Sequence, residues 1–165
     1  MTPPLLARLA SGLAPALVAV GLCVLVGSRP VDDPTLTADR AAVSVSAGGT
    51  VELTLDLGPE LARKRYLVGG SASGSFPGAL HGIVRVPLNM DAYTTAVLGR
   101  VNSACFVGFS GHLDGQGRAK ARLVMPATTR AGLAGRVYHH AAAVFDPSTG
   151  EVVEATNPVE VLLLP

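Results

Sequence analysis

Apolar and polar side chains alternate with a period of two along much of the chain between residues 41 and 164. In residues 50–57, for example, Val51, Leu53 and Leu55 alternate with polar residues. Successive side chains of a β-strand point to opposite faces, so this pattern is typical of strands with one buried face. From this alternation, or from short apolar runs, strands are predicted over 41–46, 50–57, 65–70, 83–88, 93–101, 107–113, 118–125, 136–145 and 159–164.

Glycine and proline mark turns between these segments. Residues 48–50 form either a three-residue loop or a bend that sends the flanking strands to different sheets. A turn at residues 146–150 places Phe145 opposite Val152. The alternation is loose over residues 93–101, where a strand is favoured over a short helix. Short strands, frequent turns and no convincing helical period predict an all-β domain: an antiparallel β-sandwich, immunoglobulin-like or related, with about eight to ten short strands.

Residues 107–126 are predicted to form a β-hairpin. A turn from Asp114 to a left-handed Gly117 makes Asp114 face Arg118 and Phe109 face Leu123. One face of the hairpin is then polar and the other apolar, and a shift of one residue would destroy this agreement. The same register sets Ser110 and His112 opposite Arg122 and Lys120, and this pairing favours a scaffold over an active site.

The amino terminus has the pattern of a secretory leader, because Arg8 precedes an apolar run over residues 13–27 and acidic residues follow it. The protein is therefore expected to be exported and to be extracellular, periplasmic or membrane-anchored facing outward. Contact with a membrane is expected only through the leader, if it stays uncleaved. The predicted organisation is a signal peptide or signal anchor over 1–28, a flexible linker over 29–40 and the β-sandwich domain over 41–165.

Composition disfavours nucleic acids, anionic surfaces and sugars as partners. The chain has 13 Lys and Arg against 12 Asp and Glu, so nothing in its charge attracts nucleic acid or an anionic surface. Aromatic residues make up 4% with no Trp, which is little for a surface that stacks on sugars or bases. Cys105 is the single cysteine after the leader and is expected to be a small buried apolar residue.

No stretch carries the spacing of a known catalytic or metal site. His139 and His140 are adjacent in a predicted strand and point to opposite faces, so they cannot bind one ion together. One of them is expected to be a core histidine bonded to the backbone, and the other partly exposed. The serines at 73 and 110 lack the Gly-x-Ser-x-Gly spacing of a nucleophile elbow. The sequence therefore predicts no enzyme, no cofactor and no metal ion.

Two segments are candidates for an interaction surface. Residues 69–78 are rich in Gly, Ser and Pro and are predicted to be the longest loop, with Ser73 and Phe76 available to a ligand. On the predicted hairpin, alternating cations form a positive ridge, which is either a solvated strand face or a docking patch for an acidic partner. This cation ridge consists of Arg118, Lys120 and Arg122.

The order of short motifs over residues 47–165 resembles an uncharacterised β-domain of secreted bacterial proteins, often a C-terminal accessory module of larger extracellular proteins. The resemblance implies a β-domain with no assigned activity and no catalytic residues to carry over. In this chain a leader and a linker stand where a large upstream domain would be expected. The motifs are Gly48-Gly49-Thr50, Tyr66-Leu67, Ser73-Gly74, Pro77-Gly78, Pro87-Leu88-Asn89, Gly111-His112-Leu113-Asp114, His140-Ala141 and Asn157-Pro158-Val159.

The leading functional hypothesis is an exported, non-catalytic β-sandwich that serves as a cell-surface or extracellular interaction or structural module. Its expected partner is a protein or another component of the cell envelope. The alternative is a small-ligand or carbohydrate-binding module that uses residues 69–78. A small secreted hydrolase is the third hypothesis, because a Ser/His/Asp triad assembled from distant residues is recognised only by its geometry.

Overall fold

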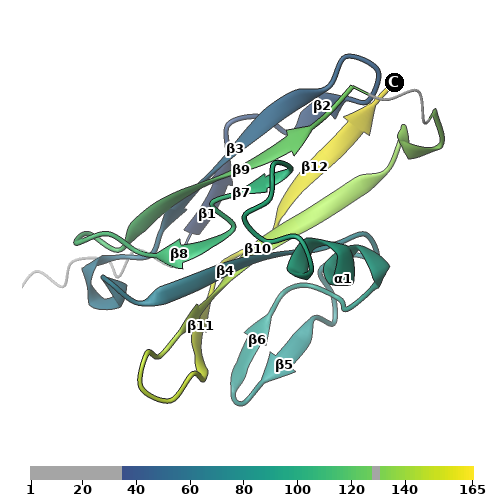
Figure 1. The fold of residues 1–165 in the computed structure, drawn as a ribbon. Helices are drawn as coiled ribbons and strands as arrows, with labels where there is room; N and C mark the ends of the chain where they lie inside the picture. The colour runs from purple at the N-terminus through teal and green to yellow at the C-terminus, as the bar shows by residue number, and fades with distance from the viewer. Residues whose placement is uncertain (1–34, 128–130) are drawn as a thin grey trace, which may run out of the picture. The chain divides into compact units, whose positions relative to one another are not determined.

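The computed structural model describes residues 35–127 and 131–165, which form two facing β-sheets with a short helix and a small hairpin beside the larger sheet (Figure 1). The smaller sheet has the strand order β1-β3-β9-β7, and the larger has the order β2-β12-β10-β4-β8, with β11 also paired to β10. The smaller sheet comprises β1 (Thr35–Ala38), β3 (Gly49–Asp56), β9 (Arg118–Met125) and β7 (Phe106–Val107). The larger comprises β2 (Ala42–Ser44), β12 (Val159–Leu164), β10 (Val137–Phe145), β4 (Arg65–Ser71), β8 (Ser110–His112) and β11 (Val152–Ala155).

The remaining elements are local. Strands β5 (Ala79–His81) and β6 (Val84–Val86) form the small hairpin, and α1 (Ala92–Leu98) follows it. Two 3-10 turns, η1 (Pro59–Leu61) and η2 (Ala131–Leu133), lie in loops. None of the helices among the described residues is long and apolar enough to cross a membrane. The predicted leader over 1–28 lies outside the described residues, as does most of the predicted linker.

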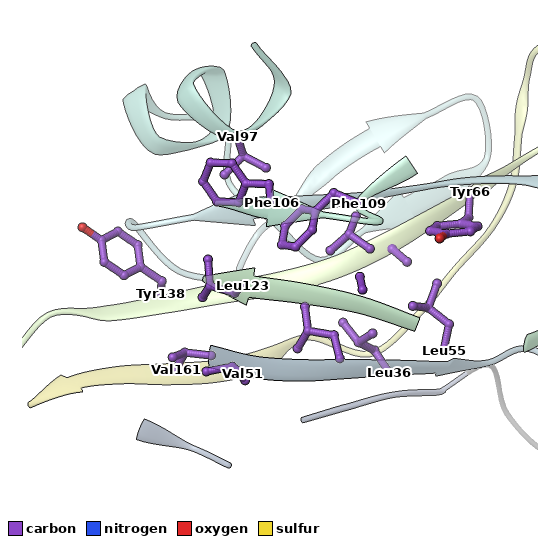
Figure 2. Close-up of a cluster of buried hydrophobic side chains, with 14 of the residues drawn as sticks. Leu36, Val51, Leu55, Tyr66, Val97, Phe106, Phe109, Leu123, Tyr138 and Val161 are labelled. Carbon is purple, nitrogen blue, oxygen red and sulfur yellow. The ribbon is translucent and has the colours of Figure 1, made fainter. Parts of the chain in front are cut away.

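The main core lies between the two sheets and is filled by the alternating residues on which the strand predictions rest. Val51 and Leu55 of β3 are fully buried and face Tyr66 of β4 and Val161 of β12 (Figure 2). A second, smaller cluster lies on the opposite face of the larger sheet, which we call the outer face. It consists of Val86, Leu88, Ala141 and Ala143.

The predicted all-β sandwich is confirmed, and so are most of its strands and turns. Residues 48–50 are a bend, because β2 pairs with β12 in the larger sheet whereas β3 belongs to the smaller one. The turn after β10 sets Phe145 opposite Val152, as predicted. The apolar run over 136–145 is a central strand, since β10 is flanked by β12 and β4.

The predicted hairpin over 107–126 is confirmed at its turn but wrong in its register, because β7 pairs with β9 so that Phe106, and not Phe109, lies opposite Leu123. The turn itself forms: the Asp114 carboxylate accepts hydrogen bonds from the backbone N–H of Gln116 and Arg118, at 2.8 and 2.9 Å, and Gly117 is left-handed. The strands then diverge, because β8 pairs with β4 of the larger sheet and β9 pairs with β3 of the smaller. Gly108 makes the change possible, since a Cβ there would lie 2.8 Å from the Lys120 carbonyl oxygen.

Two further segments differ from prediction. Residues 92–98 form a helix where a strand was favoured, because Asp91 and Thr94 make a capping box that starts it. Thr35–Ala38, inside the predicted flexible linker, form β1 and pair with β3. Leu36 is the one apolar anchor of that short strand and is 1% exposed. The linker prediction is therefore wrong for these residues.

Candidate functional site

The candidate site lies on the outer face of the larger sheet and depends on how α1 meets β4. Strand β8 pairs with Arg65–Leu67 only, so the rest of that edge of β4 is covered by α1 instead. Gly70 of β4 permits this contact, and Gly69 of the same strand makes room for Leu88, which precedes the helix. A Cβ on Gly70 would lie 2.6 Å from Cε1 of Tyr93, and one on Gly69 would lie 2.9 Å from Cδ1 of Leu88.

Asp91 fixes the start of α1 to the loop that follows β4. Its carboxylate accepts hydrogen bonds from Thr94 N at 2.9 Å, from Ser73 N and Oγ at 2.8 Å each, and from Ser71 Oγ at 3.0 Å. Partial burial alone would raise the pKa of the Asp91 carboxyl, but these hydrogen bonds outweigh it and hold the pKa below its usual range. The Asp91 carboxylate therefore joins the loop to the first turn of the helix.

Asn89 holds the other half of the same loop. Its amide nitrogen donates to the carbonyl oxygens of Ser73 and Phe76, at 3.0 and 2.8 Å, and its amide oxygen accepts from Gly78 N at 3.0 Å. The β5–β6 hairpin begins at the next residue, Ala79. Asp91 and Asn89 together set the position of the hairpin above the sheet.

An apolar pocket of about 130 Å³ lies between the sheet, α1 and the β5–β6 hairpin. Two alanines of β10, Ala141 and Ala143, line it from the sheet, and their short side chains leave the space open. Met90 and Leu98 line it and remain 64% and 41% exposed. Its other lining residues include Leu67, Gly69, Ala79, His81, Val86, Leu88, Phe145 and Val152.

A second hollow, of about 550 Å³, continues the first toward the turns of the β5–β6 and β10–β11 hairpins, which lie side by side in Figure 1. The two hollows share His81, Phe145 and Val152 as lining residues, so we treat them as one apolar groove. Ile83 lines the second hollow at the β5–β6 turn and is 99% exposed, and Glu151 lines it from the opposite hairpin. The groove thus combines an apolar floor with exposed apolar side chains at its rim.

A more polar pocket of about 420 Å³ lies at the other end of α1. Its walls include Ser73, Tyr93, Arg136 and Tyr138, and the two tyrosine rings lie 4.1 Å apart between centroids. Tyr138 is 8% exposed and, within the described residues, its hydroxyl has no hydrogen-bond partner. Tyrosine rings and a cation are groups that bind small polar ligands.

The predicted surface residues do not form one site. Ser73 donates to Asp91, and Phe76 is 87% exposed at the tip of the loop, both beside the larger sheet. The cation ridge lies on β9 of the smaller sheet, where two of its members pair with acidic residues of β3. Arg118 lies 2.9 Å from Asp56, and Lys120 lies 2.6 Å from Glu52.

His140 is the buried histidine of the pair, and its hydrogen bond differs from the prediction. Its ring is 0% exposed, and Nε2 lies 3.0 Å from the Tyr93 hydroxyl rather than from a backbone group. Burial, with a smaller effect from His139, lowers the pKa of His140 to about 4. His139 is on the opposite face, with Nε2 3.2 Å from the Glu160 carboxylate.

The contacts of the described serines, histidines and cysteine bear on whether these side chains form a catalytic or metal site. The hydrogen-bonding partners of His139 and His140 are Glu160 and Tyr93, whereas Ser71 and Ser73 bond to Asp91. No group of three metal-ligating side chains occurs in residues 35–127 and 131–165. Cys105 is half-buried against the main core.

The groove itself was missed by the sequence analysis, although one signal for it was present. The strand over 136–145 is apolar on both faces, so a second layer had to cover its outer face. Residues 79–98 fold back over β10 to form that layer, and no local pattern in the sequence predicts this long-range contact.

No protein-family model and no curated protein sequence matches the chain. Among solved structures, the E. coli chaperone DraB is similar, with a TM-score of 0.43 and 13% identity over 81% of this chain and 55% of that one. A chain of the Salmonella enterica SafA pilin in complex with the SafB chaperone is also similar, with a TM-score of 0.44 and 11% identity over 81% of this chain and 54% of that one. The match thus spans little more than half the length of either structure. The likeness is one of strand arrangement.

Proposed function

We propose that the protein is an exported, non-catalytic β-sandwich that binds a protein partner through the apolar groove on the outer face of its larger sheet. The observation that carries this proposal is the exposure of Ile83, Met90 and Leu98 around a pocket with an apolar floor. Contiguous apolar surface of this kind marks interaction sites in soluble proteins. Export is supported by the leader pattern of residues 1–28.

The size of the smaller hollow, between the sheet, α1 and the β5–β6 hairpin, suits a protein side chain better than a free ligand. Pockets for small molecules are typically about 300–1,000 Å³. The enclosed part of the groove, at about 130 Å³, is close to a cavity of about 150 Å³ that accepts a single benzene ring. It therefore suits one apolar anchor residue, the kind of contact that dominates the energy of many protein interfaces.

Photo-cross-linking in the native envelope tests this function. A benzophenone amino acid at Leu98, on the rim of the groove, is expected to give a covalent product with a protein. The matched control carries the same group at Lys120 on β9, whose side chain is 67% exposed and belongs to the cation ridge. Products at 120 but not at 98 would move the interaction surface to the smaller sheet and refute the groove.

A small-ligand function at the polar pocket is the second candidate, because Tyr93, Tyr138 and Arg136 line it next to Ser73. This retains the predicted use of the loop over 69–78, although residues 72 and 73 alone reach the pocket. The protein has no Trp and two of its three tyrosines line this pocket, so tyrosine fluorescence reports mainly on this site. Titration with soluble oligosaccharides is expected to change the fluorescence of the wild type but not of Tyr138→Phe. An unchanged wild-type signal would refute it.

A further inference from the structure

Ile83 is an apolar side chain displayed where the domain cannot bury it. It lies in the turn between β5 and β6 and is 99% exposed, at the end of the groove. Burying an apolar side chain is favourable, so such a residue gains stability once another surface covers it. The same hairpin forms one wall of the groove through Ala79 and Val86.

The enclosed end of the groove has the chemistry that an isoleucine side chain requires. Leu67, Leu88, Ala141 and Ala143 line it, and its volume of about 130 Å³ takes a group no larger than a benzene ring. A four-carbon branched side chain fits this space. One chain therefore carries both a protruding apolar group and a receptor for such a group on the same face.

The two hairpins that flank the groove carry exposed charges of opposite sign. Arg85 is exposed on the β5–β6 hairpin, and its guanidinium donates to the Pro77 carbonyl oxygen at 2.8 Å. Glu151 is exposed on the opposite hairpin. Among the described residues neither has an ion-pair partner. The inserting hairpin is thus positive, and the wall that would receive it is negative.

We propose that the occupant of the groove is a second copy of this chain, bound about a two-fold axis so that Ile83 of each copy enters the groove of the other. A two-fold interface needs a surface that is complementary to itself, and the adjacent protrusion and groove supply one. In this arrangement Arg85 of one copy approaches Glu151 of its partner. The inference rests on the proposed function, because it names the partner at the same groove.

The test places an aliphatic diazirine amino acid, whose photoreactive group is small enough for the pocket, at position 83 of the full chain, expressed with its own leader, and irradiates the envelope fraction. The expected product has about twice the mass of one chain, and peptide mass spectrometry joins position 83 to residues that line the groove. The matched control at Lys120 is expected to give no such product. This control removes association driven by residues 1–28, since that would not select position 83.

Each outcome decides between the two proposals. A product that joins position 83 to a different protein overturns the second copy and leaves the proposed function standing. The absence of any protein product at both 83 and 98, or a product with lipid alone, overturns both. A double-mass product joined outside the groove overturns the second copy.

A charge exchange supplies an independent measurement that does not alter the apolar contacts. Arg85→Glu and Glu151→Arg are each expected to lower the yield of the double-mass product from position 83 at least threefold. The double variant is expected to restore at least half of the wild-type yield, because the pair is re-formed with its charges exchanged. Equal yields in all four proteins overturn the proposed orientation.

Discussion

His140 offers a direct way to test the core of the larger sheet through the pH dependence of stability. Its ring is fully buried beside Tyr93 and Phe109, and its pKa is lowered to about 4 from a usual value of 6.5. Between these two pH values the unfolded chain binds a proton that the folded chain does not. The contribution of the neutral His140 ring to the free energy of unfolding is therefore fully present above about pH 6.5 and falls as the pH drops toward 4.

The size of the effect follows from the same two values. One pKa unit corresponds to about 1.4 kcal/mol, so acidification from about pH 7 to about pH 4 is expected to lower the free energy of unfolding by about 3 kcal/mol. The carboxyls of Asp91 and Asp146, whose pKa values lie below their usual range, act in the same direction. Their contribution is lost as the pH falls from about 5, where an unfolded carboxyl begins to take up its proton.

Urea unfolding followed by circular dichroism at several pH values measures this loss. His140→Gln keeps a hydrogen-bonding group near Tyr93 but does not titrate, so its free energy of unfolding is expected to be flat between about pH 7 and about pH 5. Tyr93→Phe is the control: it removes the 3.0 Å hydrogen bond but not the burial, so the slope is expected to remain. A wild-type protein with no slope, or a slope that persists in His140→Gln, would refute this account.

Three further predictions concern stability. Gly117→Ala is expected to lower the free energy of unfolding by more than about 3 kcal/mol, because a Cβ there would lie 1.8 Å from the Gly58 carbonyl oxygen. Gly150 is also left-handed but has open space around it, so Gly150→Ala is expected to lower that free energy by only about 1 kcal/mol. Chemical denaturation compares the two variants, and equal losses would contradict the clash. Asp91→Ala is expected to cost about 2–4 kcal/mol through loss of the helix cap and of the partner of buried Ser71, and a thermal midpoint equal to that of the wild type would disprove the role of this carboxylate. Changing all three members of the cation ridge to Ser is expected to lower the free energy of unfolding by less than about 1 kcal/mol for each ion pair lost, and to leave partner binding unchanged. A fall in cross-linking at Leu98 in this variant would instead reveal a docking role for the ridge.

The strands could be predicted from the sequence because their signal is local. The period of two identifies which residues of β3 are buried, and the Asp114 turn follows from residue types that suit it. Pairing between strands is different, because the polar face of β9 fits β3 as well as it fits β8. Asp56 and Glu52 lie opposite the cation ridge in the structure, and they are far from it in the chain. Which of these two strands pairs with β9 depends on the packing of the whole domain.

The helix was missed for a related reason. Residues 92–98 are rich in β-branched and aromatic types, which favour strands when considered one at a time. The capping box at Asp91 and Thr94 was present in the sequence as a start signal. The helix covers the edge of β4 that β8 leaves unpaired, and it can approach there because Gly70 has no side chain to clash with Tyr93. Only the packed structure shows that edge.

The position of the candidate site follows from the way β10 is covered on its two faces. A central strand that is apolar on both faces needs two layers, and β10 has the main core on one face and, on the other, Val86 of the β5–β6 hairpin and Leu88 just after it. The outer layer is narrow, so it cannot cover the whole of that face. Ala141 and Ala143 then leave a hollow under it, where larger side chains would have filled the space. The groove therefore arises from the small side chains of one strand and the shortness of the segment that covers it. A partner would bind the apolar surface that these two features leave open.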